Sequence, residues 1–87
     1  MIANEIYESL RECVDLSFKP GTYPMLPSIV ECLEKMHNIV SDGQWNSRDT
    51  RWGAGLGRLV MDDFSFSESE LGTRLLNIAD SWCKKGN

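Results

Sequence analysis

The chain of 87 residues lacks any long apolar run. No segment approaches the ~20 apolar residues that a helix needs to cross a bilayer. Asn4, Glu5 and Glu8 interrupt the first segment before an apolar stretch builds up, so this segment does not resemble a secretory signal. We therefore expect a protein without a membrane-spanning helix that works in the cytoplasm.

Histidine and cysteine, which ligate most transition metals in proteins, are also scarce. His37 is the only histidine, which excludes a histidine-rich metal site, and its place beside the apolar side of a helix predicts a packing role. The three cysteines, Cys13, Cys32 and Cys83, are an odd number at separations that match neither a disulfide framework nor a zinc site. We predict three reduced, largely buried thiols and no bound metal or cofactor.

An excess of positive charge is absent as well. The 9 Lys and Arg residues stand against 13 Asp and Glu residues, so the net charge is -4. A negative protein repels nucleic acids and anionic membranes, and a protein partner with a basic or polar surface fits it better. The contents of 41% hydrophobic and 25% charged residues are those of a folded chain, and the length predicts one domain over residues 1–87.

The pattern that is present is helical. From Ile2 to Phe18, apolar residues recur at steps of three and four, as they do on one side of an amphipathic helix. The apolar residues are Ile2, Ile6, Leu10, Cys13 and Val14. The Pro- and Gly-containing segment 19–24 then predicts a turn.

A second helix is predicted from about Pro24 or Pro27 to Ser41. Two starts are open for it. Pro27 can occupy the first turn, where its missing amide hydrogen costs nothing, or Ser28 can cap the helix together with Glu31. The dipeptide at 42–43, Asp-Gly, ends this helix, because glycine readily adopts the left-handed conformation of a helix terminus.

A third helix is predicted from Asn46 to about Phe64. Its apolar residues have helical spacing, although three glycines, at 53, 55 and 57, weaken a helix interior. We favour a helix because Gly53 and Gly57 lie one turn apart, and we predict that one of them lies against a neighbouring helix with no space for a side chain. The alternative is that residues 59–67 are partly extended.

The last helix has the clearest start. Ser67 and Glu70 match a capping box, and Phe66 and Leu71 match the hydrophobic staple that accompanies it. This helix is predicted from about Glu68 to Lys84. Four amphipathic segments with short connections predict an all-α fold, a small antiparallel four-helix bundle-like domain that is at least 55% helical.

Motifs that carry catalytic chemistry are not convincing. The glycines at 53, 55 and 57 are spaced G-x-G-x-G, whereas a dinucleotide-binding loop needs G-x-G-x-x-G after a strand. Asp62 and Asp63 are adjacent, and adjacent side chains of a helix point about 100° apart, so they are weak evidence for a metal site. We expect a protein that is not an enzyme.

Four acidic residues of the first helix form a stripe spaced three, four and three residues apart, on the side away from the apolar residues. They are Glu5, Glu8, Glu12 and Asp15. With only Arg11 nearby, they create a negative potential that accelerates encounter with a basic partner. The alternative is an ordinary solvated face, which every amphipathic helix has.

The loop of residues 44–52 is the best candidate for a contact site. Trp and Arg are enriched at interface hot spots, and we predict that Trp45, Arg48 and Arg51 contact a partner. The structural alternative places Trp52 on the core face of the third helix and makes Trp45 a staple before Asn46. Nucleic-acid binding through these arginines is poorly supported by the overall acidity.

Two functions follow from these features. The first is a non-enzymatic protein-binding module, such as a small acidic inhibitor, immunity-type or adaptor protein that docks on a basic or polar protein. The second is a structural or regulatory subunit that self-associates, for example as a homodimer, through the glycine-rich third helix.

Overall fold

Amphipathic helices account for most of the chain. The computed structural model describes residues 2–19, 23–43 and 47–85. Its elements are α1 (Ile2–Ser17), α2 (Leu26–Asp42), the 3-10 helix η1 (Ser47–Asp49), α3 (Thr50–Met61), α4 (Phe64–Ser67) and α5 (Glu70–Lys85). These ranges contain no strand, and the helical content is well above the 55% expected. The all-α prediction is therefore confirmed.

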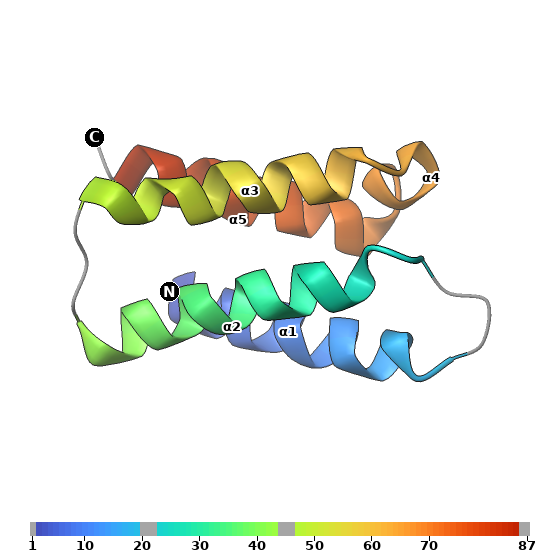
Figure 1. Cartoon of the computed structure of the whole chain (residues 1–87), viewed down its shortest axis with the longest axis horizontal. Helices are drawn as coiled ribbons and strands as arrows, with labels where there is room; N and C mark the ends of the chain where they lie inside the picture. Colours follow the sequence, from blue (N-terminus) through green and yellow to red (C-terminus); the bar gives the residue numbers. More distant parts are fainter. Residues whose placement is uncertain (1, 20–22, 44–46, 86–87) are drawn as a thin grey trace.

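The four long helices form two antiparallel pairs that lie one on the other (Figure 1). One pair is α1 with α2, and the other is α3 with α5. Between the pairs α2 packs on α3 and α1 packs on α5, whereas α1 and α3 have no contact and lie on opposite corners. This confirms the antiparallel four-helix prediction. The short helix α4, which was not predicted, packs on α3 and α5 at one end of the bundle.

One core of buried apolar side chains joins the two pairs. Its largest members are Trp82, Phe66, Ile6, Leu26, Ile29, Leu33, Met36, Leu56, Leu75 and Ile78. The buried Trp82 indole N–H donates to the backbone oxygen of Asp49, with an N–O distance of 2.6 Å. This bond satisfies the one polar atom of the ring and connects α5 to the start of α3.

The start and end of α2 decide between the alternatives left open. Pro27 lies in the first turn of α2, as one alternative predicted, and the N-cap residue Met25 makes no side-chain cap bond. The box of Ser28 with Glu31 is therefore wrong. Gly43 ends the helix with a positive φ of 67°, and its N–H donates to the backbone oxygen of Val40, as glycine at this position predicts.

Gly53 allows α3 and α5 to approach closely. A Cβ atom at this residue would lie 2.8 Å from Cδ1 of Trp82 and 3.0 Å from the backbone oxygen of Ala79. The prediction of a glycine without space for a side chain is thus confirmed at Gly53. A Cβ at Gly57 would be 3.8 Å from the Ala79 Cβ, an ordinary contact, and a Cβ at Gly55 would meet nothing within 4 Å.

These three environments predict opposite effects of the same substitution. Gly53→Ala should lower the free energy of unfolding by about 1–3 kcal/mol, because the added methyl overlaps the Trp82 ring and a backbone oxygen. The matched control, Gly55→Ala, should raise it by about 0.5–1 kcal/mol through helix propensity. Urea denaturation measures both, and equal effects would contradict the assigned packing.

The predicted capping box at Ser67 is wrong by two residues. Ser67 is the last residue of α4, and its hydroxyl donates to the backbone oxygen of Phe64 at 2.8 Å. Ser69 is the cap of α5, because its Oγ accepts from the backbone N–H of Gly72 at 3.0 Å. The hydrophobic staple fails with the box, since the residues on either side of this cap that would form it are Glu68 and Thr73.

A tertiary contact explains why the cap lies later than predicted. A Cβ at Gly72 would overlap the backbone oxygen of Phe66, so the first turn of α5 lies directly against α4. Asp63 starts α4: it is extended, with φ -122° and ψ 113°, and its Oδ1 accepts from the N–H of Phe66 at 3.0 Å. Residues 59–67 are therefore helical on both sides of an extended Asp63, and the partly extended alternative is wrong for most of this range.

Two serine substitutions separate the observed cap from the predicted one. Ser69→Ala removes the acceptor for Gly72 and should cost about 0.5–2 kcal/mol of unfolding free energy. Ser67→Ala removes only a bond to a carbonyl within its own turn and should cost less. Thermal unfolding of both variants checks the order, and a larger loss for Ser67→Ala would contradict the cap at Ser69.

Candidate functional site

The acidic stripe of α1 is an exposed surface, which we call the acidic face. Its residues Glu5, Glu8, Glu12 and Asp15 are all exposed. Three of them, with Arg11, line a shallow hollow of about 260 Å³. The helical spacing thus brings the four carboxylates together on one side, as predicted.

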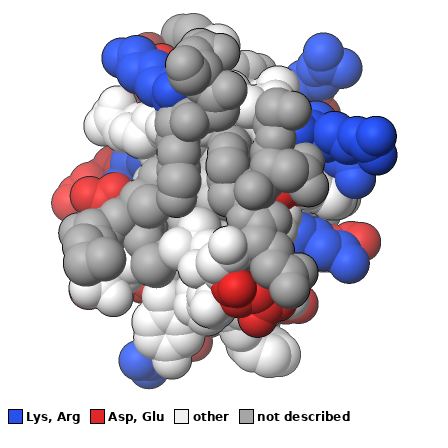
Figure 2. Space-filling view, turned by 90° about the vertical axis from the view of Figure 1, so that its left-hand side faces the viewer, with Lys and Arg blue, Asp and Glu red and all other residues white. Residues whose placement is uncertain are grey.

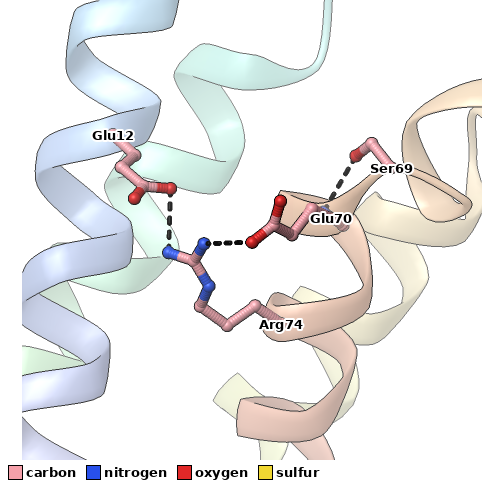
Figure 3. Close-up of polar contacts among 5 residues, drawn as sticks. Glu12, Ser69, Glu70 and Arg74 are labelled. Atoms are coloured by element: carbon pink, nitrogen blue, oxygen red, sulfur yellow. Dashed lines mark hydrogen bonds and ion pairs between the residues drawn. The ribbon is translucent and has the colours of Figure 1, made fainter.

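A cation from α5 lies beside this face, and no pattern in the sequence indicated it. The Arg74 guanidinium is 2.9 Å from Oε2 of Glu12 and 3.7 Å from Oε1 of Glu70, so it bridges α1 to the first turn of α5 (Figure 3). The hydrogen bond to Glu12 raises the pKa of Arg74 above its ordinary value. The expectation that Arg11 is the only cation nearby is therefore wrong; Arg11 instead lies over the Tyr7 ring, 6.0 Å from its centroid.

Arg74 divides the acidic face into two parts. The Arg74 and Glu12 side chains are 35% and 48% exposed, so their ion pair contributes at most about 1 kcal/mol to stability. It nevertheless neutralises Glu12. Glu5, Glu8 and Asp15 have no ion pair within 4.0 Å among the described residues, and their charge remains available to an external partner.

The predicted Trp and Arg patch is described only in part. Trp45 lies outside the described residues. Arg48 and Arg51 are exposed at the start of the α3 segment, and the Arg51 guanidinium lies 5.0 Å from the centroid of the Trp52 ring. Trp52 is half-buried and packs against the core, as its alternative role predicted. Figure 2 looks onto this end of the bundle and shows Lys and Arg side chains mainly around the half formed by α3 and α5.

A groove between α2 and α3 adjoins Arg51 and was not predicted. Its volume is about 480 Å³. It is lined by Ser28, Glu31 and Cys32 of α2 and by Arg51, Trp52, Gly55 and Leu59 of α3. The floor of the groove is mostly apolar, and its rim carries one negative residue, Glu31, and one positive residue, Arg51. The sequence contained no sign of it, because it depends on which helix α3 packs against.

Apart from Tyr7 of α1, three large apolar side chains of the described residues are exposed, and these too were missed. Phe18 is 82% exposed, Met61 60% and Phe64 73%. Phe18 directly follows α1, Met61 ends α3 and Phe64 begins α4, and these helix termini lie at the same end of the bundle (Figure 1). Phe64 and Phe66 are two residues apart in a helical turn, so they point to different sides. Only Phe66 enters the core, where its ring contacts Tyr23 with a centroid distance of 4.8 Å.

The acidic face and the arginines of α3 do not form one continuous site. They belong to α1 and α3, the two helices that have no contact with each other. The structure therefore has two separate charged surfaces. The sequence predicted both as contact regions, but it did not indicate how they lie relative to each other.

The remaining candidates for chemistry have packing roles. His37 is half-buried, and its ring lies 5.5 Å from that of Tyr7. The Cys32 thiol donates to the backbone oxygen of Trp52 at 3.3 Å. Burial raises the pKa of the Cys13 thiol to about 12 and that of Cys32 to about 11. Across the described ranges, no group of three His, Cys, Asp or Glu residues could hold a metal ion, and Asp63 caps α4.

The thiols should therefore differ in reactivity. Cys13 and Cys32 are buried and protonated at pH 8, whereas Cys83 is half-buried. In the native protein a thiol reagent such as Ellman's reagent should label Cys83 first, because the thiolate is the nucleophile. Cys13 and Cys32 should follow at the rate of unfolding. Cys83→Ala should abolish the fast phase; fast labelling that persists in this variant would contradict the assigned burial.

None of the helices in the described part of the chain combines the length and apolar character needed to cross a membrane. Comparisons of the sequence with family models, with curated proteins and with solved structures found no match.

Proposed function

We propose that the protein is a non-enzymatic protein-binding module that docks the acidic face of α1 on a basic surface of a protein partner. The observation that carries this proposal is that Glu8 and Asp15 are both exposed and have no ion pair among the described residues. They lie seven residues apart, which is two helical turns or about 10.5 Å along the axis.

The charge of the whole molecule supports this docking mode. The net charge of -4 adds a long-range attraction to any basic surface. Exposed charges act mainly on the rate of encounter, and their effect falls as salt is added. Affinity then depends on side chains that become buried. We assign a second, separate contact to Trp45, Arg48 and Arg51, because Trp and Arg dominate interface energetics and the arginines do not belong to the acidic face.

An inhibitor, immunity-type or adaptor role fits such a module, because these roles need a rigid charged surface and no catalytic group. We place the protein in the cytoplasm, because three free thiols, two of them buried, persist in a reducing compartment.

Charge reversal tests the acidic face. In Glu8→Lys/Asp15→Lys the association rate with a partner recovered by pull-down from native extract should fall at least about tenfold at low salt, and added salt should reduce the difference from wild type. Arg74→Gln should raise the rate, because Glu12 regains its uncompensated charge. Surface plasmon resonance measures both effects.

The matched control is Glu34→Lys/Asp42→Lys, which changes the net charge equally at exposed residues of α2. It should lower the rate less. If the control and the α1 variant behave alike, only net charge matters and the acidic face is not a docking surface. If no partner is recovered and no self-association occurs, the proposal is wrong.

A further inference from the structure

Among the described residues, no other helix covers the outer face of α3. Arg51, Ala54 and Arg58 are exposed on the side away from α5. Neither arginine has an ion pair within 4.0 Å among the described residues, and the space around Gly55 is open. This face carries two arginines in a chain whose net charge is -4, and Glu31 of α2 lies on the rim of the adjoining groove.

The spacing of these arginines matches the acidic face. Arg51 and Arg58 are seven residues apart, and so are Glu8 and Asp15. Both pairs therefore span about 10.5 Å along their helices, so two helices that lie along one another can form both ion pairs at once. Ala54 and Gly55, which lie between the arginines, carry little bulk and allow another helix to approach.

The groove beside Gly55 adds a surface that such a helix can bury. Its volume of about 480 Å³ and its floor of Cys32, Trp52 and Leu59 offer apolar contact next to Arg51. The Arg51 guanidinium is already held against the Trp52 ring, which reduces the entropy lost when it pairs with a carboxylate.

We propose that α1 of a second copy of this chain docks on the outer face of α3, with its Glu8 and Asp15 paired to Arg51 and Arg58. This rests on the proposed function, because it names the basic surface that the acidic face binds. Charge complementarity selects a second copy as the occupant, since the chain itself supplies both members of the match.

The position of the two faces determines the symmetry of the assembly. Because α1 and α3 lie on opposite corners of the bundle without contact, one pair of molecules cannot use both faces of each at the same time. The contact is therefore heterologous, and it leads to a ring or to open-ended chains. Wild-type protein should form a concentration-dependent series of oligomers at low salt and dissociate as salt is added.

Two blocking variants and their mixture provide the test by sedimentation velocity. Arg51→Glu/Arg58→Glu removes the basic face, and Glu8→Lys/Asp15→Lys removes the acidic face. Each alone should be monomeric at about 0.01 M salt, with the association constant lowered at least about tenfold. Their equimolar mixture should associate again, first as heterodimers and then as alternating oligomers, because the intact acidic face of one variant fits the intact basic face of the other and the two reversed faces are also complementary.

The variant that carries all four substitutions separates complementarity from net charge. It has the same net charge as wild type, with the signs of the two faces exchanged, and should self-associate again. Gly55→Leu should weaken association by filling the space between the arginines, and its helical circular dichroism should stay unchanged because nothing lies within 4 Å of that Cβ position. Lys19→Glu/Lys84→Glu, at two exposed lysines, is the control for added negative charge and should still associate.

Wild-type protein that stays monomeric at low salt, or a mixture of the blocking variants that forms no heterodimer, overturns the inference. Binding to a different basic protein tests the proposed function separately. If Glu8→Lys/Asp15→Lys still slows binding to a different basic protein, the inference fails and the proposed function stands. If no basic protein binds either, both fail.

Discussion

The close contact between α3 and α5 at Gly53 determines which residues of α3 are buried and which are exposed. The Trp82 ring lies where a side chain at residue 53 would be, and its N–H donates to the backbone of Asp49. These two interactions set the rotation of α3 about its axis. With Gly53 inward, Leu56 and Val60 enter the core. Arg51 and Arg58, two residues before and five residues after Gly53, are rotated by about 200° and about 140° from it and must face solvent. The basic outer face is thus a consequence of the inner packing.

Periodicity was sufficient to predict the four long helices, because each buries one stripe of apolar side chains. The helix termini were predicted where the deciding atoms are local, as at Gly43. They were wrong where a tertiary contact decides. The S-x-x-E pattern at Ser67 is a correct local motif, but Gly72 must lie against the Phe66 carbonyl, and this contact moves the cap to Ser69.

The candidate site was likewise predictable only where its residues belong to one helix. The acidic face was predictable because all its residues belong to one helix, so their mutual spacing is contained in the sequence. Arg74 comes from α5 and the groove needs both α2 and α3, and neither pairing of helices can be read from a spacing. Arg74 changes the interpretation of the acidic face. It removes Glu12 from the charges that an external partner can meet and leaves Glu5, Glu8 and Asp15.

The diagonal placement of the two charged faces explains how they can persist in one small molecule. Were α1 next to α3, their opposite charges would pair within the chain and no potential would remain for a partner. Instead the bundle is 21 Å by 19 Å across its two shorter axes, and this exceeds the Debye length of about 8 Å at physiological salt. Faces on opposite corners are therefore largely screened from each other, whereas a second molecule in direct contact meets either face unscreened. The fold keeps both charged surfaces apart, and only intermolecular contact can bring them together.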